Sequence, residues 1–173
     1  MAAKQWSSKF PFVHDNYILR VLSATFGPSK KGSAMITFEM EIASPETKVM
    51  AGEEYTIAGT KLRHYVVTIA KDAKGNVDAE KTAKAADRVA ELYKGFGIEQ
   101  PADFNPENPD VSVFVGKVVW AEVDVDDDIK RKTPTAEQAA AGQPGDVMEN
   151  PVTGEKLETH FPRLVQVFGV ATL

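Results

Sequence analysis

The fold is decided by the stretch from residue 16 to residue 42, NYILRVLSATFGPSKKGSAMITFEMEI. In residues 34–42 the apolar side chains alternate with Met, Thr and Glu, and a period of two with one apolar face is typical of a half-buried β-strand. Residues 16–26 are partly apolar on both faces, which favours a curved strand shared between two layers. Residues 27–32 contain Gly and Pro and predict a turn. The whole stretch is therefore predicted to form a β-hairpin.

The rest of the chain adds three strand regions and one main helix. Asp78 is suited to cap the helix, small and apolar residues then recur at helical spacing, and Gly95 and Gly97 predict its end. Gly59 predicts a bend inside the third strand region. The predicted strand regions are residues 16–26, 34–42, 54–69, 111–125 and 163–171, and the predicted helix spans residues 78–95.

Five strand regions with one α-helix between strands 3 and 4 have the element order of a mainly β, OB-fold-like barrel. The helix is expected to plug the barrel, with partner binding as the alternative. The chain has 173 residues, enough for one core, so residues 1–173 are predicted to be a single domain. Residues 1–15 form an irregular N-terminal arm, apolar enough to pack on the body or to join a binding surface, and residues 44–53 form a loop. Residues 126–160 form a long polar loop between strands 4 and 5, functional or mobile, with room for a short helix at 135–141.

Composition and charge narrow the classes of function. The absence of cysteine excludes disulfides, thiolate zinc sites and cysteine nucleophiles, and it fits a reducing cytoplasm. The first residues lack the apolar core of a signal peptide, and no apolar run reaches the roughly 18 residues of a membrane span. We therefore expect a cytoplasmic protein (in the host cytoplasm if viral) with no membrane partner. The net charge of −5 counts against a protein that coats duplex nucleic acid, and less against a single-strand binder, because local charge matters more than the sum.

Motifs for catalysis and metal binding are missing. The patterns HExxH, GxSxG and GxxxxGK[ST] do not occur, and the three histidines are far apart. An acidic cluster covers residues 122–128, and its alternating aspartates resemble the start of a calcium loop, but Ile129 stands where that loop needs glycine. A solvated strand end is the favoured interpretation, and repulsion of nucleic acid or recruitment of a basic partner is a further one. A two-metal nuclease would need more carboxylates from other strands. No enzymatic activity, metal or cofactor is expected.

Cationic and aromatic side chains occur together at several places. Single-strand binders combine cations, which follow the phosphates, with aromatic faces on which bases stack. In an OB barrel, strands two and three with the loops one–two and four–five form the binding face, and these loops are residues 27–32 and 126–160 here. The predicted nucleic-acid-binding residues are Tyr17, Arg20, Lys30, Lys31, Lys61, Arg63, Tyr65, Lys117, Trp120, Lys130, Arg131 and Lys132. The same mixed clusters contain Trp6, His64, His160, Phe161 and Arg163. Core positions are expected for Phe38, Phe114 and Phe168, while Tyr65 and Trp120 fit either core or surface.

The chain also resembles a known family, the small OB-fold single-stranded DNA-binding proteins of bacteriophages. The resemblance covers roughly residues 14–125 and rests on NYILRV (16–21), SKKGSAMITFE (29–39), the helix at 78–97 and VGKVVWA (115–121). It implies a protein that coats exposed single strands in phage DNA replication or recombination, with replication proteins as further partners. Many such proteins carry an acidic C-terminal tail, whereas this chain ends in the apolar VFGVATL.

The leading hypothesis is a non-enzymatic protein that binds single-stranded DNA with little sequence preference. The runner-up is a β-barrel assembly or adaptor module, such as a viral structural protein, whose apolar arm and last strand pair with neighbouring subunits. A metal-dependent enzyme built on the acidic cluster is third. The choice between DNA and RNA, and the formation of a homo-oligomer, are left open.

Overall fold

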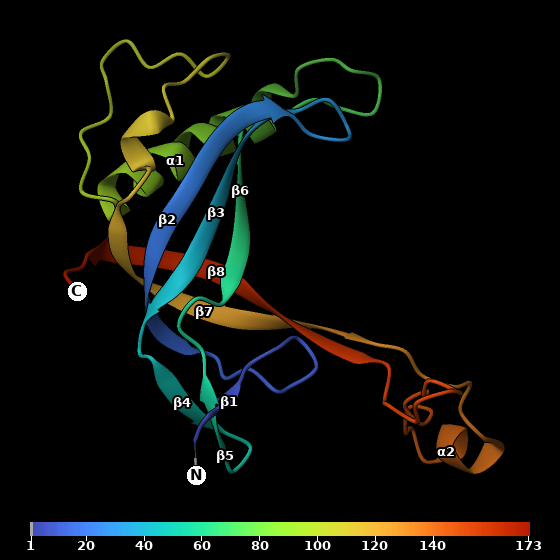
Figure 1. The fold of residues 1–173 in the computed structure, drawn as a ribbon. Helices are drawn as coiled ribbons and strands as arrows, with labels where there is room; N and C mark the ends of the chain where they lie inside the picture. The colour runs from blue at the N-terminus through green and yellow to red at the C-terminus, as the bar shows by residue number, and fades with distance from the viewer. Residues whose placement is uncertain (1) are drawn as a thin grey trace.

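The computed structural model describes residues 2–173 and shows a curved β-sheet, a helix against it and a long two-stranded arm (Figure 1). The mainly β prediction is confirmed. The strands are β1 (Lys4–Gln5), β2 (Asp15–Pro28), β3 (Ala34–Ser44), β4 (Thr47–Met50), β5 (Glu53–Thr56), β6 (Lys61–Ile69), β7 (Val118–Ile129) and β8 (Glu158–Val170). The helices are α1 (Ala79–Gly95) and α2 (Ala136–Ala140), and Ser112–Phe114 form a 3-10 turn. Among residues 2–173, no helix combines the length and the apolar character needed to span a membrane.

The main sheet has five strands in the order β6-β3-β2-β7-β8, each antiparallel to its neighbours. The outer strands β6 and β8 run in the same direction, because the four ladders between them are all antiparallel. Helix α1 contacts both of these strands. No hydrogen-bonded ladder joins β6 to β8 in the part of the chain that the structure describes, so a closed five-stranded barrel is not found. We call the opening between β6 and β8 the seam.

The predicted hairpin forms β2 and β3. Pro28 pairs with Ala34 next to the turn, and the ladder continues to Ile18 opposite Ser44. The side chains of β3 divide as the alternation predicts, since the buried ones are Ile36, Phe38, Met40 and Ile42. On β2, which is apolar on both faces, the buried side chains are Tyr17, Leu19 and Val21. The inner face of the hairpin is therefore one wall of the core.

Helix α1 has the predicted cap and the predicted end. The Asp78 carboxylate accepts a hydrogen bond from the Lys81 backbone N–H at 3.0 Å, and such a cap typically contributes about 1 kcal/mol. Past the helix end, Gly97 has a φ of +65°, which favours glycine. A Cβ at Gly95 would come 3.0 Å from the Val167 side chain, and one at Gly97 would come 2.5 Å from the Val170 side chain. Because both positions are glycine, the end of the helix lies directly against β8.

The core lies between α1 and the inner face of the sheet. The Phe38 ring stacks on Phe96 at 5.9 Å between centroids and meets Phe114 edge-on at 5.2 Å. The core predictions for Phe38 and Phe114 are confirmed. The prediction for Phe168 is wrong, because its side chain is 47% exposed, while the neighbouring Val167 packs against the core.

The fourth strand lies further along the chain than predicted. Gly116 has a φ of +80°, and β7 begins only at Val118 and continues through the acidic cluster to Ile129. The strand continues there because β8 pairs with it as far as the pair Ile129–Glu158. Ladder hydrogen bonds are made by the backbone and do not require apolar side chains. The last strand accordingly begins at Glu158, five residues earlier than predicted from the sequence.

Beyond the body of the protein, β7 and β8 continue as a two-stranded ribbon (Figure 1). We call residues 126–160 the arm. Its tip holds α2, which Thr135 caps in a capping box with Gln138, so the predicted short helix is confirmed. Isolated bridges between Arg131 and Val147 and between Glu149 and Lys156 connect the rest of the tip. The segment predicted as a long loop is therefore largely structured.

A second sheet has the strand order β1-β5-β4. Strand β4 lies within the segment predicted as a loop, and a turn at Gly59, with a φ of +85°, separates β5 from β6. The N-terminal arm is not wholly irregular, because β1 pairs in parallel with β5. Phe12 is buried, and its ring lies 5.3 Å from that of Tyr17 between centroids, so the N-terminal segment packs on the body.

Candidate nucleic-acid interface

A groove of about 770 Å³ follows the seam between β6 and β8. Side chains alternate along a strand, so each edge contributes to both the floor and the rim. Buried or partly buried positions form the floor, and exposed positions form the rim. The floor residues are Leu62, His64, Pro162 and Leu164, and the rim residues are Lys61, Arg63, Tyr65, Phe161 and Arg163. The carboxylates of Glu39 and Asp126 also line the groove.

Two aromatic rings stand on opposite edges of this groove. Tyr65 comes from β6 and is 53% exposed, and Phe161 comes from β8 and is 49% exposed. Both keep about half of their surface free, which an aromatic side chain needs if a base is to stack on it. The pairing of β3 with β6 places Tyr65 opposite Thr37, a small neighbour that leaves the ring accessible.

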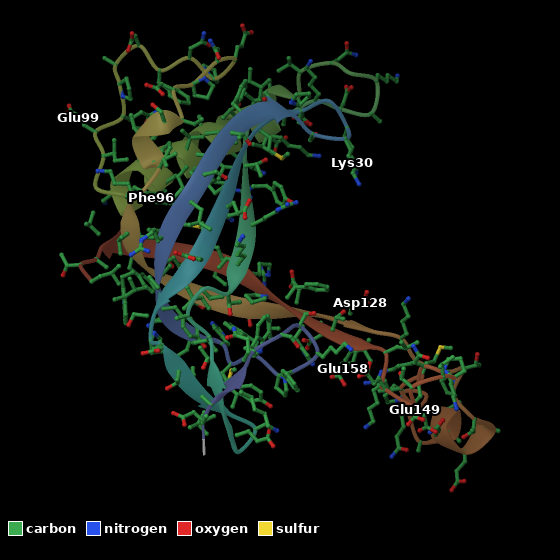
Figure 2. The ribbon with its side chains drawn as sticks, in the orientation of Figure 1. Lys30, Phe96, Glu99, Asp128, Glu149 and Glu158 are labelled. Atoms are coloured by element: carbon green, nitrogen blue, oxygen red, sulfur yellow. The ribbon has the colours of Figure 1, made fainter. Side chains whose placement is uncertain are left out.

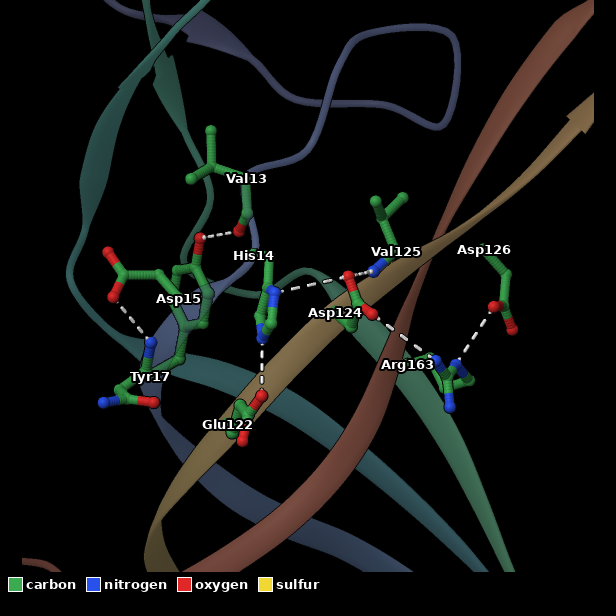
Figure 3. Close-up of polar contacts among 10 residues, drawn as sticks. Val13, His14, Asp15, Tyr17, Glu122, Asp124, Val125, Asp126 and Arg163 are labelled. Carbon is green, nitrogen blue, oxygen red and sulfur yellow. Dashed lines mark hydrogen bonds and ion pairs between the residues drawn. The ribbon is translucent and has the colours of Figure 1, made fainter.

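The cations of the rim differ in how far their charge is compensated. Arg63 has no ion-pair partner among residues 2–173. Lys61 lies 3.6 Å from a Glu39 carboxylate oxygen. Arg163 lies 3.0 Å from Asp126 and 3.5 Å from Asp124 (Figure 3). Exposed pairs of this kind contribute at most about 1 kcal/mol each, so an incoming phosphate can compete for these cations.

His64 is the one ionisable side chain of the floor. Its ring lies 6.3 Å from the Phe38 ring between centroids, and burial lowers the pKa of His64 below its ordinary value. The imidazole is therefore neutral near pH 7, with one nitrogen as donor and the other as acceptor. Neither nitrogen makes a hydrogen bond to another group within residues 2–173.

Tyr17 was predicted to contact nucleic acid, and that prediction is wrong. Its side chain is wholly buried, and its hydroxyl donates a hydrogen bond to the Val13 carbonyl at 2.6 Å (Figure 3). The Lys48 ammonium lies 5.0 Å from its ring centroid, and burial raises the pKa of the hydroxyl. Of the two apolar faces of β2, the one that carries Tyr17 faces the core, which the alternation alone could not decide.

Arg20, Lys117 and Trp120 lie on the outside of the sheet, away from the groove lining. Arg20 pairs with Glu41 at 3.3 Å. Trp120 is 42% exposed and lies opposite Ile18 on one side and Gly169 on the other. Along β7 it is three residues from Val123, which pairs with the lining residue Leu164, and six residues from Asp126, which correspond to roughly 10 Å and roughly 20 Å of strand. These residues form a separate exposed patch.

The remaining predicted cations are at two distant places. Lys30 and Lys31 occupy the β2–β3 turn, and Figure 2 shows Lys30 far from Asp128 on the arm. Residues 130–132 begin the tip of the arm, where the Arg131 guanidinium donates to the Gly145 carbonyl at 3.0 Å. The structure therefore brings together Lys61, Arg63 and Tyr65 from the predicted set and joins them to Phe161 and Arg163 from the far end of the chain.

Phe161, Arg163 and His64 were not in the predicted binding set, although the sequence shows them within mixed basic and aromatic clusters. The missing information was the position of β8 relative to β6, which depends on pairing between segments about 100 residues apart. No local pattern encodes such a distance.

The carboxylates of the acidic cluster make close contacts within the fold. His14 lies between Glu122, at 2.5 Å, and Asp124, at 3.7 Å (Figure 3). Further along the arm, Asp127 and Glu158 both face His160. In the described residues, no group of three or more His, Asp or Glu side chains could hold a metal ion.

Comparison with family models, with curated proteins and with solved structures gives no match to this chain. The resemblance to the bacteriophage single-stranded DNA-binding proteins therefore stays a prediction, and function has to be argued from the groove itself.

Proposed function

We propose that this protein binds single-stranded DNA, with little sequence preference, in the groove between β6 and β8. The observation that supports the proposal is the meeting of two half-exposed aromatic rings, Tyr65 and Phe161, with the cations Lys61, Arg63 and Arg163 along one groove. The two edges that supply them are far apart in the sequence. Cations and aromatic faces on one groove are the combination that single-strand binding requires.

In this proposal the bases stack on Tyr65 and Phe161, and the phosphates lie against Arg63, Lys61 and Arg163. Stacking contributes roughly 1–3 kcal/mol per base and does not depend on base identity. A duplex would be disfavoured, because its base faces are already stacked on one another. The function would lie in coating exposed strands during replication or recombination, as the family resemblance implies.

We also infer that the main sheet is an OB fold opened along one seam. Three features support this inference. The sheet order β6-β3-β2-β7-β8 corresponds to strands three, two, one, four and five of an OB barrel. The long helix α1 lies in the chain between β6 and β7, which correspond to OB strands three and four. That helix contacts both edges of the opening, as a barrel plug would.

The test is fluorescence anisotropy of labelled oligo-dT of about 30 nucleotides, at low and high salt, with duplex DNA and oligo-U as competitors. Tyr65→Ala and Phe161→Ala should each weaken binding by roughly 1–3 kcal/mol. Phe168→Ala is the matched control, since Phe168 is equally exposed on the same strand but does not line the groove. The proposal is wrong if the wild-type protein shows no binding at micromolar concentration in low salt, or if all three variants bind alike.

The arm supports a second candidate, an assembly or adaptor module. It projects from the body and exposes apolar side chains at its tip, with Val152 91% and Met148 39% exposed. Light scattering over a range of protein concentrations distinguishes the candidates. Assembly that is lost when residues 133–155 are replaced by a short Gly-Ser turn, with no affinity for oligo-dT, would favour this function.

A further inference from the structure

The floor of the groove has a composition that stacking and phosphate binding do not explain. Leu62 and Leu164 are each only 4% exposed, and Pro162 lies between the rim residues of β8. His64 is the single polar side chain among these floor positions, and its ring nitrogens are without a partner in residues 2–173. Among residues 2–173, Thr60 Oγ1 is the fully buried side-chain polar atom without a partner, so the His64 nitrogens are not sealed in the core. They are open to the groove that His64 lines, and this imidazole is therefore suited to meet a ligand that brings its own donor and acceptor.

An unpaired base is such a ligand. Every base carries adjacent donors and acceptors on its Watson–Crick edge, and a neutral imidazole offers one of each. Burial keeps His64 neutral, which preserves its acceptor nitrogen. In a duplex the same edge is occupied by the partner base. A contact to this edge therefore distinguishes unpaired from paired bases without selecting a sequence.

We propose that His64 hydrogen-bonds the Watson–Crick edge of an unpaired base inserted into the seam between β6 and β8, and that this contact discriminates single strands from duplexes. The inference rests on the proposed function and adds a residue role to it. Tyr65 and Phe161 hold the faces of the bases, while His64 recognises an edge. The depth of the seam is what makes this possible, since His64 lies on the floor, behind the exposed residues of the rim.

The experiment compares two oligonucleotides of the same length, oligo-dT and its analogue in which 2,4-difluorotoluene replaces thymine. The analogue keeps the shape and the stacking face of the base but has almost no hydrogen-bonding edge. The wild-type protein should prefer oligo-dT about three- to tenfold, the value expected for one hydrogen bond. In His64→Leu this preference should fall to about one, and His64→Gln, which keeps a donor and an acceptor, should restore part of it.

The ratio of the two affinities protects the test against partial unfolding, because a loss of folded protein lowers both affinities by the same factor. His64→Ala gives a second variant if His64→Leu does not fold. The role of His64 is overturned if a folded His64 variant keeps the wild-type preference for oligo-dT, or if the wild-type protein has no preference. Failure of the proposed function looks different, because the wild-type protein would then bind neither oligonucleotide.

Discussion

Arg163 of β8 donates from Nε to Asp126 of β7 at 3.0 Å, so a cation on the rim of the groove is already bound to a carboxylate of the adjacent strand. A second carboxylate, that of Asp124, lies 3.5 Å from the same guanidinium. In the proposed function these carboxylates occupy the position where a phosphate would bind. They would therefore compete with phosphate for Arg163 and lower the affinity of the groove for nucleic acid.

Asp126→Asn should therefore strengthen binding to oligo-dT. The variant removes one of the two carboxylates that pair with Arg163 and a negative charge from the groove lining, and the gain should be up to about 1 kcal/mol, the usual range for an exposed pair. Anisotropy titration at low salt measures it. Asp87→Asn on the exposed side of α1 makes the same change in net charge and should have little effect. Equal gains from both variants would show that only the total charge matters.

Arg63→Gln should reduce the salt dependence of binding. Each phosphate contact to a single strand contributes about −0.7 to the slope of log K against log salt concentration, so contacts to Lys61, Arg63 and Arg163 predict a slope near −2. Loss of the Arg63 contact should make the slope smaller by about 0.7. Lys74→Gln in the exposed turn before α1 is the control. A wild-type affinity that hardly changes between about 50 and 500 mM salt would contradict phosphate binding altogether.

Trp120→Ala should leave binding of a short oligonucleotide, of about six nucleotides, close to wild type. Trp120 is exposed but does not line the groove, so a strand that occupies only the groove does not contact it. With an oligonucleotide of about 30 nucleotides a larger effect would show that the strand continues over the β2–β7 surface. A large effect with the short one would place the primary site on that surface instead of the seam.

Gly97→Ala should destabilise the fold by about 1–3 kcal/mol in urea unfolding. Its φ is +65°, and the new Cβ would come 2.5 Å from the Val170 side chain. Gly75→Ala is the matched control, because Gly75 also has a positive φ of +82° but open space around it, so that only the backbone strain is shared. The difference between the two variants measures the contact of the helix end with β8.

His64 should make the protein less stable under mildly acidic conditions. Its pKa is lowered in the folded state from 6.5, so the unfolded chain takes up the proton first as the pH falls. This contribution to stability is present above pH 6.5 and is lost as the pH falls through the folded-state pKa. Urea unfolding at a series of pH values should show it, and His64→Leu should have a flatter pH dependence than the wild type. Identical curves would mean that the imidazole is freely solvated in the folded protein.

Local patterns in the sequence predicted the elements that local interactions determine. The hairpin of β2 and β3, the Asp78 cap and the Thr135 cap each depend on residues close together in the chain, and all three are present. Residues 126–128 were assigned to a loop because three successive aspartates carry no strand pattern, whereas the ladder with β8 holds them in a strand. Tyr17 was misplaced because β2 has two apolar faces, and only the packing of α1 and the N-terminal arm decides which is inner.

The sequence shows the two clusters of the candidate site separately, one on β6 and one on β8, but it does not show that they face each other. Lys61, Arg63 and Tyr65 stand out in the sequence because they lie at alternate positions of one short segment, whereas Phe161 and Arg163 lie about 100 residues further along the chain. The two parts of the site come together because β6 and β8 lie close to each other without sharing a ladder, and α1 contacts both strands.

The contact of Gly95 and Gly97 with β8 has a mechanical consequence. The end of the helix lies directly against Val167 and Val170, so we infer that the position of β8 depends on the position of this helix end. A larger residue at either position would need extra space between the helix and β8. We expect it to push β8 away from the helix and so to shift β8 relative to β6. In the proposed function, substitutions at these glycines would change base binding from the opposite side of the molecule, without altering any residue proposed to touch the ligand.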